Sequence, residues 1–487
     1  MHAPLAPQPA AERAFSADKL IPLLEGGPPA TTSNFMLAQN LLNNYVGMVL
    51  LSMHFAFART GWMTLPLLAV LTALGAWTGE LIIESYRTIC AEGVSVPSYA
   101  QIGERCMGAF GKWLVVVSSV VETYTSCLCI LIIIWANTAL LLPNVELPWI
   151  IVGCSILSFP TNWLRDFTLL SFLSVVGTCC VLLIIVVVVY NVFSVPPSAP
   201  DATTELFDVD GIAMSSSIIL AGLTGHVALP PMFAEMRTPS AFRSVLYTSF
   251  LGMFVIYGVV GGCGYALYGS DASVLITHDI SKAWSAPNDG AWVGPALANL
   301  VLGAITFKLF CSVRAPPALH CSQRSVLHER LPAQRWPPCL EPPAWSPPLV
   351  TQMPLCIVVL VDIAQTTVHE WRGKELSPAA CDVVRLLLWG TSVINAACVY
   401  SWLQYVTALI GINSMLISVL LPIVFYYLLH RRRMSAPVRA MHLVLMVLSL
   451  ALTIAIGYVD VNEFVDSLRR LHHSDDESNQ TTLGGVP

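Results

Sequence analysis

Long apolar segments recur along this 487-residue chain and are separated by shorter polar stretches. A helix crosses the bilayer core with about 20 consecutive apolar residues, which is close to the length of these segments. The pattern therefore predicts an all-α protein that crosses a membrane eleven times. The predicted spans cover residues 36–58, 63–84, 113–142, 149–167, 169–194, 212–235, 245–269, 291–313, 383–403, 405–429 and 438–458.

The polar segments divide the chain into three regions. Residues 1–34 are rich in Pro, Ala and acids and lack the apolar run of a cleavable signal peptide, so a disordered cytoplasmic tail is expected. Residues 35–458 form the predicted membrane domain. Residues 459–487 are polar and form a predicted tail on the lumenal or extracellular side.

A Pro-rich segment, residues 314–382, interrupts the spacing of the spans. Its apolar run at 353–363 is too short to cross a bilayer and carries Asp362. A twelfth span there would also move the Arg cluster at 431–433 to the outside, against the preference of Arg for the cytoplasm. We therefore expect one long cytoplasmic loop.

Basic residues fix the expected orientation, because Lys and Arg are retained on the cytoplasmic side. Most of the 24 Lys and Arg residues fall in loops on the same side as the N-terminus, which predicts that this terminus is cytoplasmic. The one glycosylation sequon, at Asn479, then lies on the opposite side, although a chance sequon explains it equally well. The cations predicted outside are Arg59, Lys282, Arg469 and Arg470, and Lys308 lies within a span.

Composition narrows the class of protein further. With 55% hydrophobic and 11% charged residues, the chain has too little polar surface for a soluble domain. The net charge of −6 is spread thinly, so no nucleic-acid partner is expected. All 14 cysteines fall in predicted spans or cytoplasmic loops, which disfavours disulfides. We find no pattern typical of a cofactor, a metal site or a membrane-embedded enzyme.

The first and sixth spans contain residues that interrupt helices. Span one has two adjacent amides, Asn43 and Asn44, followed by Gly47. Span six contains Gly222, Thr224, Gly225, His226, Pro230 and Pro231 within ten residues. Irregular backbone at membrane depth is tolerated only where it lines a cavity or is buried in protein. These two spans are therefore the first place to look for a binding site.

The two interrupted spans are five spans apart. This spacing is typical of two five-helix halves related by inverted topology, in which the broken first helix of each half holds the substrate. We predict such a 5+5 repeat of the leucine-transporter type with one extra helix. Glycines that only allow close helix packing are the alternative explanation.

Several short motifs resemble the amino acid/auxin permease family, which includes vesicular inhibitory and neutral amino acid transporters. The resemblance covers most of residues 35–313 and 383–458. Departures from the family pattern are Val49, Ser52 and His54 in span one, together with the 314–382 segment. The matching residues are Asn43 or Asn44, Gly47, Leu50, Ala56, Phe57, Gly61 and Trp62 in span one, Trp77 to Gly79, Ser98 to Gly103, Gly225, His226, Pro230 and Met236, and Gly264, Tyr265, Tyr268 and Gly269.

The resemblance implies a secondary active transporter of amino acids or similar small zwitterions. It would work by alternating access and, as a first expectation, would couple transport to protons; sodium is the alternative, because the family has both kinds of member. The predicted sidedness fits a vacuolar, lysosomal or vesicular membrane as well as the plasma membrane. A channel or a non-transporting receptor-like membrane protein is the other class considered, but no filter loop or single dominant polar helix is visible.

The expected site follows from these two breaks and the resemblance. In folds of this type an aromatic hydroxyl on the third helix often caps the substrate carboxylate, which suggests Tyr124, with plain packing as the alternative. Ionisable groups at membrane depth suggest the coupling site, although Glu122 is equally well explained by helix packing and Lys308 by reaching to the membrane surface. The substrate-binding candidates are Asn44, Gly47, Met48, Val49, Tyr124, Gly222, Thr224, Gly225 and His226, and the coupling candidates are Lys308, Thr306, Glu122 and Asn43.

Overall fold

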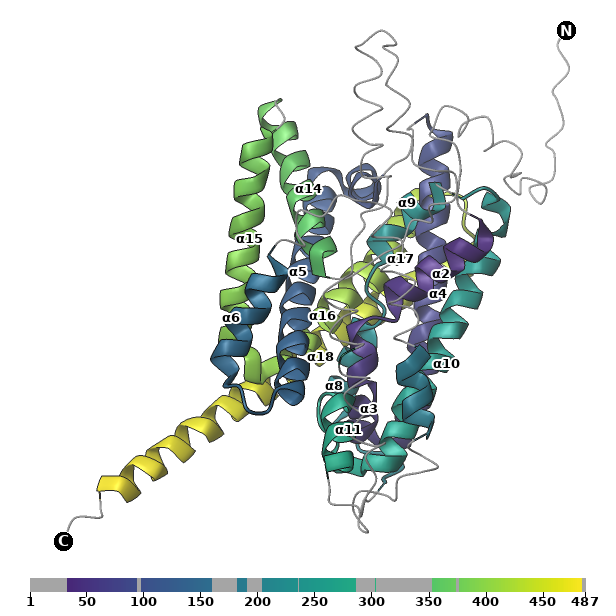
Figure 1. Cartoon of the computed structure of the whole chain (residues 1–487). Coiled ribbons are helices and arrows are strands. Elements are labelled where there is room, and N and C mark those ends of the chain that lie inside the picture. The colour runs from purple at the N-terminus through teal and green to yellow at the C-terminus, as the bar shows by residue number, and fades with distance from the viewer. Residues whose placement is uncertain are drawn as a thin grey trace, which may run out of the picture.

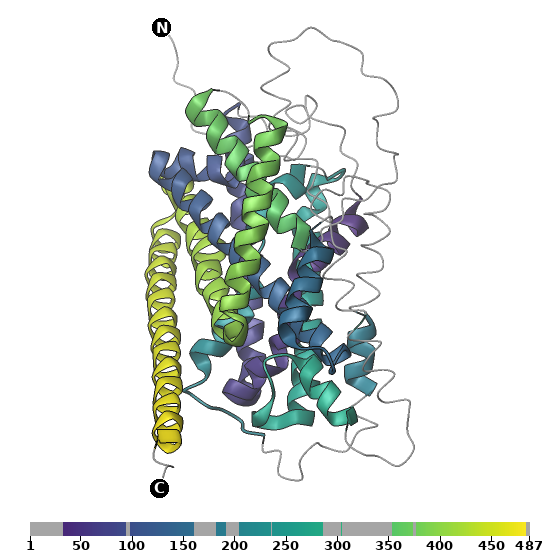
Figure 2. The ribbon, with the colours of Figure 1, turned by 60° about the vertical axis from the view of Figure 1, so that its left-hand side comes forward.

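The computed structural model describes residues 33–93, 98–159, 182–190, 204–234, 236–285, 303, 353–373 and 376–483, and of residues 471–483 only the backbone. The regular elements in these ranges are helices, in agreement with the predicted all-α membrane fold. The helices form an elongated bundle with α18 along one side (Figures 1 and 2). The predicted eighth span, with Thr306 and Lys308, lies outside the described residues apart from Gly303.

The first part of the bundle starts with a broken helix and continues with two long ones. Its elements are α2 (Asn34–Tyr45), the 3₁₀ turn η2 (Met48–Ser52), α3 (Met53–Thr60), the 3₁₀ turn η3 (Gly61–Met63), α4 (Thr64–Ala91), α5 (Tyr99–Leu141) and α6 (Leu147–Ser158). Residues 182–190 are also helical.

The middle part contains the second broken helix. Its elements are α8 (Ile212–Ala221), η5 (His226–Ala228), α9 (Leu229–Ala234), η6 (Pro239–Ala241), α10 (Phe242–Tyr268), η7 (Gly269–Asp271) and α11 (Ile276–Ser285). The last part consists of α14 (Met353–Arg372), α15 (Pro378–Cys398), η9 (Tyr400–Trp402), α16 (Leu403–Ser414), the π-helical segment η10 (Met415–Leu420), α17 (Leu421–His430) and α18 (Ala436–Leu483).

Seven helical stretches in the described ranges are long and apolar enough to cross a membrane. The number of eleven stays a prediction, because much of the fifth and eighth predicted spans falls outside these ranges and α6 has only 12 residues. The seven stretches are Met48–Ala91, Tyr99–Leu141, Ile212–Ala234, Pro239–Asp271, Pro378–Cys398, Tyr400–His430 and Ala436–Arg470.

The largest differences from the expected helices are in α5, in the segment 314–382 and in α18. The helix α5 begins at Tyr99 because Ser98 and Gln101 form a capping box, and it bends at Gly108, where φ is +66°. The segment 314–382, expected as a loop, contains the 20-residue helix α14, which packs against α5 and α15. The helix α18 continues past the expected boundary at 458 to Leu483, because no Gly or Pro interrupts it there.

The breaks lie at the centre of the packing. The half-helices α3 and α8 pack against each other, α8 also packs against α16, and α10 covers α2, α3 and α4. The helix α5 contacts α14, α15 and α16 on the other side. The interior between them is almost entirely apolar.

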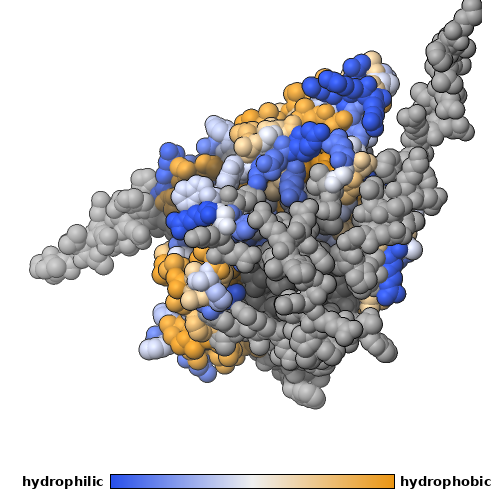
Figure 3. Space-filling view, turned by 90° about the horizontal axis from the view of Figure 1, so that it is seen from above, coloured by the Kyte–Doolittle hydropathy of each residue, from blue (hydrophilic) through white to orange (hydrophobic). Residues whose placement is uncertain are grey.

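Apolar side chains also cover much of the outer surface. On α18, Val444, Val447 and Ile454 are each more than 60% exposed. The end-on view in Figure 3 shows hydrophobic side chains at the periphery of the described part of the molecule, beside hydrophilic ones. An apolar periphery of this kind is what lipid-facing helices require.

Candidate functional site

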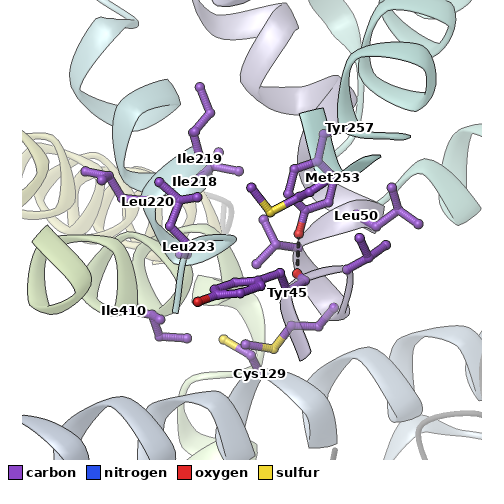
Figure 4. Close-up of a cluster of buried hydrophobic side chains, with 14 of the residues drawn as sticks. Tyr45, Leu50, Cys129, Ile218, Ile219, Leu220, Leu223, Met253, Tyr257 and Ile410 are labelled. Atoms are coloured by element: carbon purple, nitrogen blue, oxygen red, sulfur yellow. Dashed lines mark hydrogen bonds between the residues drawn. The ribbon is translucent and has the colours of Figure 1, made fainter. Parts of the chain in front are cut away.

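The first membrane helix is interrupted in its middle. The helix α2 ends at Tyr45, and the chain passes through Gly47, with φ −110° and ψ −135°, before the 3₁₀ turn η2 leads into α3. The hydroxyl of Tyr257 on α10 donates a hydrogen bond of 2.6 Å to the carbonyl of Tyr45, one of those released by the break (Figure 4). Met48 and Val49 follow as buried residues of η2.

The sixth helix is interrupted at the same level. The helix α8 ends at Ala221, and Gly225 has φ +114°, a left-handed conformation that strains any residue with a side chain. Two prolines then lie in the first turn of α9, Pro230 and Pro231, where the backbone N–H groups have no helical partner to lose. The sequence thus explains both where the helix stops and where it resumes.

The two breaks face each other. A side chain added to Gly225 would collide with the side-chain amide of Asn44, which shows that Asn44 of the first break packs directly against the backbone of the second. The Tyr45 ring lies edge-on to His226, with ring centroids 5.9 Å apart. In Figure 4, Tyr45 points from the first break toward Leu223 of the second, with Ile410 close by.

Glu122 of α5 joins this meeting point. Its side chain is buried, and Oε1 accepts a hydrogen bond of 3.1 Å from the backbone N–H of Gly225. Its second oxygen, Oε2, is buried and has no hydrogen-bond partner among the described residues. The predicted coupling residue is therefore in direct contact with the second break.

Two further polar atoms at the breaks are also buried without a partner in the described part of the chain. They are the amide nitrogen of Asn44 and the hydroxyl of Tyr45. A buried polar group without a hydrogen bond costs about 1–3 kcal/mol. Two donors and one acceptor at and beside the two breaks therefore fit a small ligand that carries both an acceptor and a donor.

His226 is fixed by backbone groups. It is fully buried, with Nδ1 3.1 Å from the carbonyl oxygen of Leu223 and Nε2 3.0 Å from that of Gly75. The hydroxyl of Thr78 lies 3.4 Å from Nε2. Nε2 therefore connects the second break to α4, while Nδ1 contacts a carbonyl of the break itself.

The structure does not bring every predicted residue to the breaks. Tyr124 accepts a hydrogen bond of 2.7 Å from the amide of Asn395 on α15, so its hydroxyl is used away from Gly225. Gly222 packs against the ring of Tyr257, and Thr224 is partly buried beside it. Asn43 is described only by its backbone within α2.

Sequence reasoning missed two polar features. Tyr45 is not among the predicted site residues, because nothing in an apolar helix marks which hydroxyl remains unpaired. His54, noted only as a departure from the family pattern, is fully buried, and its Nε2 lies 2.8 Å from a carboxylate oxygen of Asp279 on α11. Partial desolvation lowers the pKa of the adjacent His278, which favours its neutral form beside this pair.

The described residues contain no group of three or more His, Cys, Asp or Glu that could hold a metal ion. The site is instead a pair of broken helices at membrane depth, with a buried carboxyl beside them. This arrangement is the one that transporters with interrupted helices use to hold a solute.

The chain belongs to the family described as transmembrane amino acid transporter protein, whose model matches residues 30–460. This confirms the resemblance seen in the sequence motifs. The family and the relatives named below are described as transporters and not as enzymes, which agrees with the expected class of multi-pass membrane protein.

Individual relatives come from Arabidopsis thaliana. The chain is 28% identical over 269 residues to "Amino acid transporter AVT1D", which covers 52% of this chain and 48% of that protein. It is 25% identical over 263 residues to "Amino acid transporter AVT1E", with 52% and 49% covered. The chain thus spans about half the length of these curated relatives.

Among solved structures, the chain is similar to a manganese transporter of Eremococcus coleocola. The TM-score is 0.41 at 12% identity, with 95% of this chain and 97% of the other covered.

Proposed function

We propose that this protein is a secondary active transporter of small zwitterionic amino acids that works by alternating access around its two broken helices and is coupled to protons. The observation that carries the proposal is a set of three polar atoms at and beside the two breaks that are buried without a partner among the described residues: the Asn44 amide, the Tyr45 hydroxyl and Glu122 Oε2. Membership of the amino acid transporter family supports the substrate class.

A zwitterion satisfies the chemistry of this place. Its carboxylate accepts hydrogen bonds from the Asn44 amide and the Tyr45 hydroxyl, while its ammonium group binds backbone carbonyls that the breaks leave free. Gly47 provides the break in the first helix, and Met48 and Val49 supply apolar surface beside it. The proposed substrate also lies against the second break, at Gly222, Thr224 and His226.

Glu122 links the proton to the substrate. As a carboxylate it occupies the N–H of Gly225, a donor that a substrate carboxylate also needs. A proton on Glu122 removes its charge and weakens this hydrogen bond, because bonds to an ionised acceptor are roughly twice as strong. Proton and substrate then bind more tightly together than either does alone, which is the requirement for symport.

Thr306 and Lys308 stay candidates for the coupling site, with Asn43, and a sodium ion is the alternative coupling ion. Tyr124 acts through Asn395, positioning α5 against α15. The proposed membrane is vacuolar, lysosomal, vesicular or plasma, with a cytoplasmic N-terminus.

The proposal is tested by uptake of a labelled panel of neutral amino acids into proteoliposomes. With one proton carried per substrate, a pH gradient of one unit supports up to about tenfold accumulation. A channel only equilibrates its solute, so accumulation excludes that class. Absence of uptake under both proton and sodium gradients would contradict transport.

The variant Glu122→Gln separates binding from coupling. Its amide oxygen still accepts from Gly225, so uptake down a gradient is expected to continue, while accumulation and substrate-evoked proton flux fall at least about tenfold, to background. Glu146→Gln is the matched control, because Glu146 is exposed at the start of α6. Equal proton flux in wild type and Glu122→Gln would remove Glu122 from the coupling role.

A further inference from the structure

The helix α18 lies outside the predicted pair of five-helix halves, yet it carries an acid into the core. Asp460 has only 3% of its surface exposed, and its Oδ2 accepts a hydrogen bond of 2.5 Å from the hydroxyl of Ser217 on α8. Its other oxygen is buried without a partner among the described residues. A buried acid on a membrane helix is costly, and such residues usually mark a functional site.

The packing brings α18 close enough for this contact through small residues. A side chain on Gly411 of α16 would collide with the backbone of Ser217, so α16 and α8 touch there. Gly457, one turn before Asp460 on α18, faces Ile412 of α16. These two glycines let three helices converge around one carboxyl group.

A second contact, one turn further along α18, reaches the other broken helix. Glu463 forms an ion pair of 2.6 Å with Arg59 at the end of α3. The halves α3 and α8 are themselves joined, since the hydroxyl of Ser215 donates to the carbonyl of Ala56 at 2.7 Å. Asp460 and Glu463 lie one turn apart on α18. Asp460 binds α8 and Glu463 binds α3, and these two half-helices pack against each other.

The charges around Asp460 come from few groups. Glu463 on its own helix and Arg59 on α3 are the ionised residues that act on it, and Ser217 is its neighbour on α8. On α16, the hydroxyl of Tyr405 donates a hydrogen bond of 3.4 Å to the backbone carbonyl oxygen of Glu463 and contributes no charge. Arg59 is already paired with Glu463. Among the described residues, the Ser217 hydroxyl is therefore the one hydrogen-bond donor to Asp460. A carboxylate can accept about four hydrogen bonds, so Asp460 is poorly satisfied for a buried carboxylate.

We propose that Asp460 is a proton-binding site, separate from the substrate site, that controls how firmly α18 holds α8. The ionised carboxylate accepts a strong, charge-assisted hydrogen bond from Ser217. Adding one proton to the carboxylate gives the neutral acid and weakens that bond, so α8 is freed to move. In the proposed topology, the proton comes from the lumenal or extracellular side, on which α18 ends.

The proposal rests on the proposed transport function for its kinetic test but not for its spectroscopic one. Acidifying the α18 side is expected to increase the rate of uptake by wild type severalfold. Asp460→Asn mimics the neutral acid, so it should lose the part of the pH dependence that Asp460 adds, while the pH dependence and the substrate-evoked proton flux that arise from Glu122 persist. Asp466→Asn, at an exposed position on the same helix, should keep the wild-type pH profile.

Infrared difference spectra of the purified protein between acid and neutral pH detect the proton directly. The carboxylic-acid band of Asp460 is expected in wild type and Asp466→Asn and is expected to be absent in Asp460→Asn, where only the contributions of other acids such as Glu122 remain. Ser217→Ala keeps the titrating acid but lacks the hydroxyl that binds it, so it should retain the band and lose the part of the pH dependence of uptake that Asp460 adds. An unchanged band in Asp460→Asn, or an unchanged pH profile in Asp460→Asn, would overturn the proposal.

The two proposals fail in different ways. If wild type takes up no amino acid, the proposed function falls while the infrared band still decides whether Asp460 binds a proton. If wild type transports and Asp460→Asn keeps its pH profile, only the inference about α18 falls.

Discussion

At the scale of single residues, the site depends on Gly225. Its positive φ and its contact with Asn44 both exclude a side chain. The sequence predicted this glycine and Asn44 because helix-breaking residues at membrane depth are unusual. It also placed Glu122 among the ionisable candidates. It did not identify Tyr45 or the partner of Tyr124, since neighbours across a bundle depend on helix rotation, which an almost uniformly apolar sequence does not encode.

Gly225→Ala is expected to reduce amino acid uptake at least about tenfold. The left-handed backbone alone costs about 1–2 kcal/mol for a residue with a side chain, and the contact with Asn44 adds a steric cost. Gly93→Ala is the control, because Gly93 also has a positive φ, +94°, but has open space around it. Initial rates and melting temperatures are compared. Similar losses in both variants would show that strain alone, and not the contact with Asn44, is responsible.

At the scale of elements, glycines set how closely the half-helix α3 packs against α10. A Cβ on Gly261 would lie 2.6 Å from the Phe57 ring, and one on Gly264 would lie 2.6 Å from Cβ of His54. The positions of the long helices followed from apolar length, and the breaks followed from Gly and Pro. The helix α14 was not predicted, because a short isolated apolar run is compatible with either a loop or a helix packed against other helices.

Replacing Gly261 by Ala is expected to destabilise the protein by about 1–3 kcal/mol, the usual cost of overpacking. The neighbouring Gly262→Ala should be nearly neutral or slightly stabilising, since its nearest contact would be 3.5 Å away and alanine favours the helix. Thermal unfolding in detergent measures the difference. A melting temperature that falls equally in both variants would contradict the close packing of α3 and α10.

At the scale of the whole molecule, the sequence predicted an all-helical membrane transporter, and the family match over residues 30–460 agrees with it. The predicted number and orientation of the helices depend on the distribution of Lys and Arg. This distribution determines how the chain inserts into the membrane, but it does not determine how the helices pack. The apolar outer face of α18 fits this arrangement, because it would be stable only in contact with lipid or another apolar surface.

The predicted sidedness is testable with a pH-sensitive fluorescent protein fused after Pro487. If the C-terminus is lumenal or extracellular, acidifying that compartment quenches the fluorescence, whereas the same fusion at the N-terminus is unaffected. Occupancy of Asn479 by a glycan would agree. Fluorescence that responds only to cytoplasmic pH would reverse the proposed topology.

The π-helical segment Met415–Leu420 interrupts the regular winding between α16 and α17 and contacts η5 beside the second break. A π turn holds one residue more than a regular α turn, and each residue of an α-helix advances by about 100°. If that surplus residue migrated along the helix during the transport cycle, the side chains it passed would swing by roughly this angle. Part of the tenth predicted span would then rotate about its own axis by one residue, without the helix separating from its neighbours.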